Sequence, residues 1–147
     1  MKGLFIKSIF IFIFLSLVFL IGCQSSASDN FSCPARQVDT WIEESGIVLR
    51  KNVEVMGMYE NANSNSELQA VVRAAEQVYK HQLLIESPQC LKRLDELSED
   101  QYYWMWKYYD AIFKGNLNEA EDYYAKAMTA MKAGDREVDR VEQEQGW

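Results

Sequence analysis

Apolar residues recur at intervals of three and four along most of the chain, and this period constrains the fold more than any other feature. The clearest stripe, which includes one glutamine, consists of Leu68, Val71, Val72, Ala75, Val78, Tyr79, Gln82 and Ile85. A helix with 3.6 residues per turn collects such positions on one face, whereas a half-buried strand would need strict alternation. The sequence therefore predicts an all-α fold, a small antiparallel bundle of four to five helices.

Capping and helix-breaking residues divide this pattern into segments. Pro34 stands at the first turn of a helix predicted over residues 35–59, a position that proline tolerates. The polar stretch NANSNS then supplies a turn, and Ser64 with Glu67 forms a capping box that begins a helix over residues 65–86. Two helices joined by so short a turn pack antiparallel.

The second half of the chain repeats this organisation. Pro88 ends the preceding helix. A short helical piece follows, with Leu91, Leu94 and Leu97 on it. A second capping box at Ser98 and Gln101 predicts a helix over residues 99–114, and Gly115 ends that helix.

The last helix is expected over residues 116–132, with Asn116 and Glu119 as its cap, and it ends before Gly134. The bundle domain therefore covers residues 33–134, and residues 135–147 form a charged C-terminal tail that extends this helix in frayed form.

Seven aromatic side chains fall within residues 101–113, QYYWMWKYYDAIF. At 100° per residue, one face carries Tyr102, Met105, Trp106, Tyr109, Ile112 and Phe113. A second, nearly opposite face carries Trp104, Tyr108 and Ala111. A helix that is apolar on two faces is normally packed between neighbours, so we expect these rings mostly in the core. The alternative is a groove in which some of them bind a peptide or an apolar ligand.

Two aromatic residues, Tyr103 and Trp147, fall outside both stripes and are the better candidates for exposed contact. The full set of candidate binding residues is Tyr103, Trp104, Tyr108, Tyr124 and Trp147.

A partial resemblance supports packing of this helix against the next one. The residues that carry it are Trp104, Gly115, Ala120, Tyr124 and Ala127, which resemble a single tetratricopeptide repeat. The resemblance implies a helical hairpin over residues 104–132, in which the face of Trp104 meets the face of Tyr124. The chain holds no second copy, so one hairpin is implied and not a repeat array.

The N-terminus has the features of an export signal. Lys2 and Lys7 accompany an apolar run, SIFIFIFLSLVFLIG, that is shorter than the roughly 20 residues a membrane helix needs. The run ends in Leu20-Ile21-Gly22-Cys23, which resembles the lipobox of bacterial lipoproteins. An uncleaved anchor over residues 4–22 is the alternative.

The lipobox resemblance implies that residues 1–22 are removed, that Cys23 is acylated, and that residues 23–32 form a lipidated spacer. The protein is then held at the membrane of the cell envelope, outside the cytoplasm, through its N-terminal lipid. Gln24 follows the acylated cysteine. Because this position is Asp in the inner-membrane retention signal of enteric lipoproteins, the resemblance implies the periplasmic face of the outer membrane where the host has two membranes.

The remaining cysteines form a pair. If Cys23 carries lipid, Cys33 and Cys90 are left in a compartment where disulfides persist, and the predicted hairpin brings both to one end. We expect a disulfide between them, with two separate buried thiols as the alternative. In the chain-entropy treatment, closing this loop of 57 residues stabilises the fold by roughly 4 kcal/mol.

Charge and the absence of catalytic patterns restrict the function. The formal charge of −7 becomes −9 without Lys2 and Lys7, so nucleic acid is disfavoured as a partner. His81, the only histidine, falls on the polar side of its helix, and it has no thiol or carboxylate set to form a metal site or a catalytic pair. No phosphate loop is present, and the acidic pairs mostly occupy first turns of helices. We therefore expect no enzyme and no cofactor.

These features favour a membrane-anchored envelope lipoprotein that acts as a non-catalytic adaptor or assembly factor and binds another envelope protein. Its overall plan is similar to that of small pilotin lipoproteins. The alternative is a binder or carrier of a small apolar ligand, held among Trp104, Trp106, Tyr108 and Tyr124.

Overall fold

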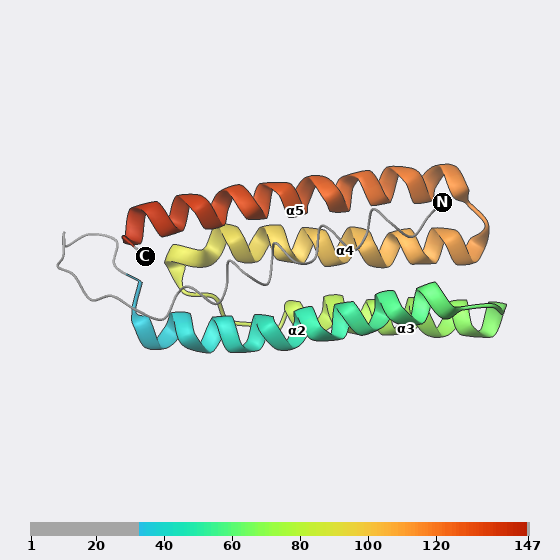
Figure 1. Cartoon of the computed structure of the whole chain (residues 1–147), viewed down its shortest axis with the longest axis horizontal. Helices are drawn as coiled ribbons and strands as arrows, with labels where there is room; N and C mark the ends of the chain where they lie inside the picture. Colours follow the sequence, from blue (N-terminus) through green and yellow to red (C-terminus); the bar gives the residue numbers. More distant parts are fainter. Residues whose placement is uncertain (1–32, 147) are drawn as a thin grey trace.

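A computed structural model describes residues 33–146 (Figure 1). Its elements are α2 (Ala35–Asn61), α3 (Asn65–Gln82), the 3₁₀ helix η1 (Gln89–Leu91), α4 (Lys92–Lys114) and α5 (Leu117–Gln145). The all-α prediction is confirmed, and the described residues contain no strand. The predicted signal peptide, Cys23, the spacer through residue 32 and Trp147 lie outside the described residues.

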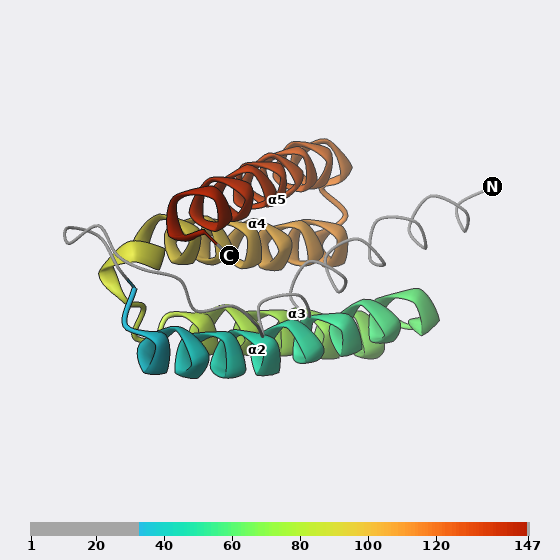
Figure 2. The same cartoon turned by 60° about the vertical axis from the view of Figure 1, so that its left-hand side comes forward.

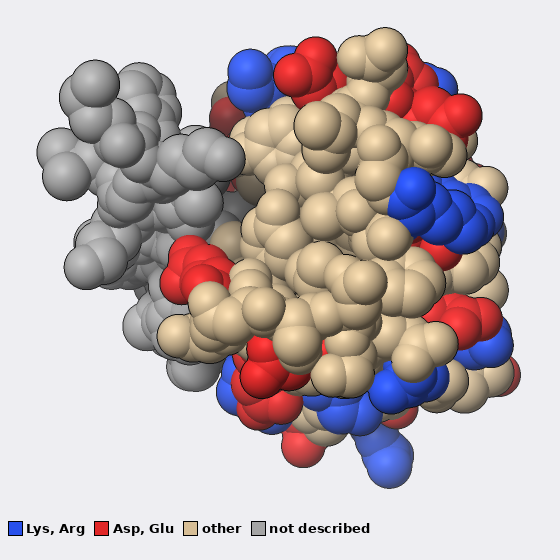
Figure 3. Space-filling view, turned by 90° about the vertical axis from the view of Figure 1, so that its right-hand side faces the viewer, with Lys and Arg blue, Asp and Glu red and all other residues tan. Residues whose placement is uncertain are grey.

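The four helices form two hairpins stacked as layers. Figures 1 and 2 show α2 and α3 in one layer and α4 and α5 in the other, with α4 between α5 and the first layer. The α2–α3 turn and the α4–α5 turn lie at the same end of the bundle, and η1 lies at the other end together with the C-terminus. Seen from the end with the turns, the surface is mostly uncharged, with charged side chains toward its edges (Figure 3).

The predicted cap at Ser64 and the predicted stop at Gly115 form. The predicted cap at Asn116 does not, because Asn116 makes no side-chain hydrogen bond to a helix N–H, and its Nδ2 donates to Glu119 Oε2 at 3.4 Å instead. The Glu67 N–H donates to Ser64 Oγ at 3.3 Å, as a capping box requires. Glu67 Oε2 accepts the N–H of Asn63 at 2.7 Å and not that of Ser64. At the other turn Gly115 adopts φ 77°, and its N–H bonds the carbonyl of Ile112, a left-handed C-cap that glycine adopts without strain.

The predicted break at Ser98 is wrong. Helix α4 begins at Lys92 and continues through Ser98, whose Oγ donates to the carbonyl of Leu94 at 3.0 Å instead of capping a new helix. The reason is tertiary: Asp95 and Leu97 are buried, so this turn packs on the bundle as part of one helix.

Two helix ends also differ from the prediction. Helix α3 ends at Gln82 and not at residue 86, although Ile85 remains buried. Helix α5 passes Gly134 and ends at Gln145, because Val141 packs in the core at 4 % exposure. Glu137 and Glu144 also bond Arg140 along this last stretch. The expected tail is therefore regular helix as far as Gln145.

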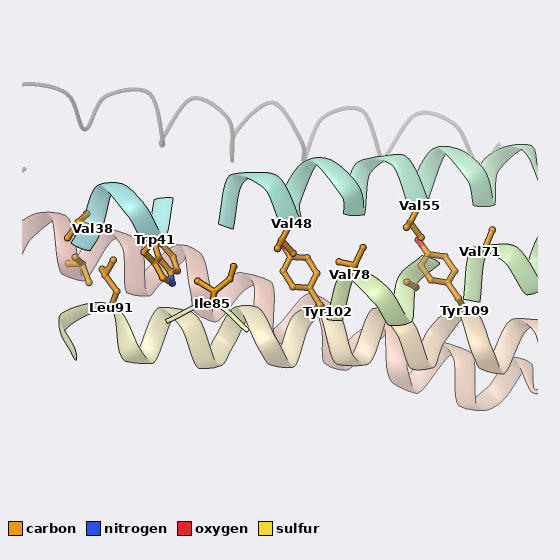
Figure 4. Packing of buried hydrophobic residues seen from close by; sticks show 12 residues of the cluster. Val38, Trp41, Val48, Val55, Val71, Val78, Ile85, Leu91, Tyr102 and Tyr109 are labelled. Carbon is orange, nitrogen blue, oxygen red and sulfur yellow. The ribbon is translucent and has the colours of Figure 1, made fainter. Parts of the chain in front are cut away.

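The core runs the length of the bundle between the layers. Figure 4 shows Tyr102 and Tyr109 pointing from α4 toward Val48 and Val55 of α2, all within one buried cluster. The stripe predicted for α3 is buried at Val71, Ala75, Val78, Gln82 and Ile85.

The Cys33–Cys90 disulfide is present, with the two Cα atoms 5.7 Å apart. It joins the start of α2 to η1, and the Cys33 N–H donates to Gln145 Oε1 at 3.1 Å. Three helix ends therefore meet where the described chain begins.

Candidate functional site: aromatic flanks of helix α4

Helix α4 has neighbours on two opposite sides, as its two apolar faces predicted. Tyr102 and Tyr109 are buried toward α2 and α3 at 7 % and 3 % exposure. On the α5 side Trp104 stacks on Tyr123, with ring centroids 5.7 Å apart. This packing leaves two flanks of α4 partly open to solvent, and aromatic rings cover both.

The first flank carries five partly buried rings that we call the aromatic ridge: Tyr79 of α3, Tyr103, Trp104 and Trp106 of α4, and Tyr123 of α5. The rings follow one another in contact from helix to helix. Tyr79 stacks on Trp106 at 5.9 Å, Trp106 meets Tyr103 edge to face at 6.0 Å, and Tyr103 meets Trp104 at 4.8 Å. The ridge therefore crosses three helices in a continuous line.

Two lysines lie on the tryptophans of the ridge. The Lys107 ammonium is 4.2 Å from the centroid of the Trp106 ring, and the Lys126 ammonium is 4.7 Å from that of Trp104. Such cation–π contacts contribute about 0.5–1 kcal/mol at exposed sites. Lys126 also pairs with Asp122 at 2.6 Å, whereas Lys107 has no ion pair within the described chain. The ridge thus combines ring edges with ammonium groups at a partly open surface.

The second flank carries a tyrosine cluster, formed by Tyr59 of α2, Tyr108 and Tyr109 of α4, and Tyr124 of α5. The Tyr108 hydroxyl donates to the Tyr59 hydroxyl at 3.3 Å, and the ring of Tyr124 lies 5.4 Å from that of Tyr108. Burial raises the pKa of Tyr108, and the hydrogen bond to Tyr59 raises it further. Burial likewise raises the pKa of Tyr109. Tyr108 and Tyr109 therefore stay protonated at neutral pH and contribute hydroxyl groups and not charge.

The structure divides the predicted binding residues between the two flanks. Tyr103 and Trp104 belong to the ridge, whereas Tyr108 and Tyr124 belong to the tyrosine cluster. Tyr103 is partly buried between neighbouring rings, while Tyr124 is 43 % exposed. The four residues therefore do not surround one common space, and each ring fills its contacts with another ring.

Sequence reasoning missed two members of the ridge, Tyr79 and Tyr123. Both come from other helices, and the register between helices is not visible in a helical wheel. Tyr79 could have been suspected from its place at the edge of the α3 stripe.

A buried polar network near the disulfide was also missed. Asp95 is 1 % exposed, and its Oδ1 accepts hydrogen bonds from Trp41 Nε1 at 3.2 Å and from Gln82 Nε2 at 2.9 Å. The other amide atom, Gln82 Oε1, is buried without a partner in the described chain. Because the three residues come from α2, α3 and α4, the network fixes the register of three helices. A carboxylate on the same stripe as Leu91 and Tyr102 was the available signal.

Among residues 33–146 no group of three or more His, Cys, Asp or Glu side chains is placed to hold a metal ion. His81 is partly buried, and its Nδ1 lies 3.1 Å from Lys51 Nζ, a contact that the sequence did not predict. None of the helices in this range is both long and apolar enough to cross a membrane.

Comparison with known proteins adds no relative: no family model, no curated protein and no solved structure matches the chain.

Proposed function

We propose that this protein is a membrane-anchored envelope lipoprotein that acts as a non-catalytic adaptor or assembly factor and binds another envelope protein. The observation that supports binding is the aromatic ridge. Tryptophan and tyrosine are enriched where interfaces carry most of their binding energy, and here five such rings lie at a partly open surface across three helices. Because each ring already packs against another ring, these side chains lose little conformational freedom when a partner binds.

The anchor rests on the lipobox at Cys23, and the fold is compatible with it. The described chain begins at the disulfide end of the bundle, next to Cys90. A tether entering there lies at the opposite end of the bundle from the two turns (Figure 1).

The anchor is tested by labelling cells with a radioactive fatty acid. The wild-type chain is expected to take up label and to fractionate with membranes, and Cys23→Ser is expected to lose both properties. Membrane association of Cys23→Ser equal to wild type, through an uncleaved helix, would contradict the lipid anchor.

The adaptor role is tested by site-specific photocrosslinking in the native envelope. A photoreactive residue at Tyr103 or at Tyr123 is expected to give one discrete product with a second envelope protein. The same residue at Asp139, an exposed position of α5 outside the ridge, is the matched control and is expected to give none. Equal products from all three positions, or none from the ridge, would count against a protein-binding ridge.

A further inference from the structure

An open groove of about 520 Å³ lies between α2 and α3, on a different flank from the aromatic ridge. Its floor consists of Val55, Ala74 and Val78. The exposed α2 residues that line it, such as Lys51 and Met58, are separate from Trp41 and Tyr59, which contact α4, and among the α2 residues that line it only the buried Val55 belongs to both the groove and the core. The groove therefore lies on a side of the hairpin that the second layer does not cover.

The two ends of the groove carry exposed apolar side chains. Met58 is 41 % exposed and Leu84 is 79 % exposed. The helices run antiparallel, and Lys51 contacts His81, so Leu84 lies at the Lys51 end and Met58 at the Ala74 end. From Ala74 to the end of α3 at Gln82, helical rise of 1.5 Å per residue gives about 12 Å, or a little over two helical turns, and Leu84 lies just beyond this end.

A groove of this shape fits an amphipathic helix better than a small ligand. Small-molecule sites bury about 70–90 % of the ligand surface, which a groove this open to solvent does not do. An amphipathic helix needs only a groove that takes its apolar face, with anchors spaced at i, i+4 and i+7. A helix laid along α2 and α3 would cover Met58 and Leu84 together.

The charges that line the groove indicate which side chains a bound helix would carry. The lining contains Lys51, Lys80 and His81 against a single acid, Glu54, in a chain whose formal charge is −7. Lys51 Nζ lies 3.1 Å from His81 Nδ1, so these two nitrogen-bearing side chains lie together at the Leu84 end of the groove. Lys51 and His81 have no carboxylate partner within the described chain, whereas Lys80 pairs with Glu76.

We propose that this groove binds an amphipathic helix of a partner protein, about two to three turns long, with an acidic side chain that meets Lys51 and His81. The assignment goes beyond the proposed adaptor role, because it names a second surface and the chemistry of its occupant. It holds whether or not the aromatic ridge binds a partner.

Photocrosslinking with mapping of the joined peptides tests the occupant. A photoreactive residue is placed at Leu84, at Met58 and, as a control outside the groove, at the exposed Gln69 of α3, in the full chain in its own envelope. The expected result is a product from Leu84 and Met58, absent at Gln69, whose mapped peptide alternates apolar and acidic residues with helical spacing. Adducts with lipid, with a second copy of this chain or with a peptide lacking that pattern would overturn the proposal, as would no groove-specific product.

Charge reversal tests the acidic contact. Lys51→Glu is expected to lower the Leu84 product about tenfold, an effect of the size that interfacial charge pairs reach. Lys51→Arg is expected to keep it. Lys132→Glu, at an exposed position of α5, is the matched control for net charge and is expected to leave the product unchanged. An equal loss of product in Lys51→Glu and Lys132→Glu would refute the contact. A photoreactive residue at Tyr103 in the Lys51→Glu chain tests whether the aromatic ridge is unaffected by this change.

Discussion

Asp95 is a buried acidic side chain, and its hydrogen bonds limit which residues can replace it. It accepts two hydrogen bonds, from Trp41 and Gln82, at a site with 1 % exposure. Asp95→Ala leaves both donors buried without an acceptor, and each such loss costs about 1–3 kcal/mol. We expect this variant to lower the free energy of unfolding by several times that of an exposed acid-to-alanine change such as Asp139→Ala, measured by urea denaturation.

The matched variant Asp95→Asn distinguishes the effect of losing the two hydrogen bonds from the effect of losing the carboxylate. Its amide oxygen takes the place of Oδ1 and still accepts from Trp41 and Gln82. We therefore expect Asp95→Asn to be much less destabilising than Asp95→Ala. Equal losses in the two variants would show that the negative charge itself is needed.

Tyr102 gives the bundle a dependence on alkaline pH. Burial raises the pKa of Tyr102 to about 12, from an ordinary value of 10.0. Between pH 10 and about 12 the unfolded chain releases this proton while the folded chain keeps it, so stability falls as pH rises through that range. A pKa difference of this size corresponds to roughly 3 kcal/mol.

Tyr102→Phe removes the titrating phenol, so we expect its stability to decline less between pH 10 and 12 than that of wild type. Urea denaturation at pH 8, 10 and 11 measures the difference, and Tyr124→Phe, at an exposed ring, is the control. A Tyr102→Phe curve parallel to that of wild type would contradict the argument.

At the scale of elements, replacing either of two glycines with alanine is expected to change stability in opposite directions, because one glycine ends a helix and the other lies inside one. Gly115 ends α4 with φ 77°, where any side chain is strained, so Gly115→Ala is expected to destabilise by about 1 kcal/mol. Gly57 lies inside α2, and a Cβ there would meet nothing within 4 Å. Gly57→Ala is therefore expected to stabilise by about 0.5–1 kcal/mol. Thermal unfolding followed by circular dichroism compares the two variants. A raised melting temperature for Gly115→Ala would contradict the strained C-cap, and a lowered one for Gly57→Ala would contradict the open space at Gly57.

The same elements show what the sequence can and cannot predict. The stripe of α3, the cap at Ser64 and the Gly115 turn are local patterns, and all three are present in the structure. The false break at Ser98 came from a local capping signal that the burial of Leu97 overrides. The aromatic ridge and the α2–α3 groove depend on which residues of neighbouring helices lie side by side. Apolar periodicity fixes the face of each helix but not that register.

At the scale of the whole molecule, the two hairpins are joined along their shared core and by one covalent link. The disulfide closes a loop of 57 residues that contains all of α2 and α3, and it holds the start of α2 beside η1. The Cys33 N–H also reaches Gln145 near the end of α5. The disulfide and this hydrogen bond therefore hold the start of α2 beside η1 and beside the end of α5.

The double variant Cys33→Ser/Cys90→Ser removes this link while keeping two small side chains. Because the open chain regains the conformational freedom of the loop when it unfolds, we expect a loss of roughly 4 kcal/mol in the free energy of unfolding. Urea denaturation of both proteins measures the loss, and wild type treated with a reductant should match the variant. Hydrogen exchange should quicken first in the opening turn of α2, whereas the Asp95 network keeps Trp41 in place. Exchange that quickens first in α5 would instead show that the bridge acts mainly on the end of the C-terminal helix through Gln145.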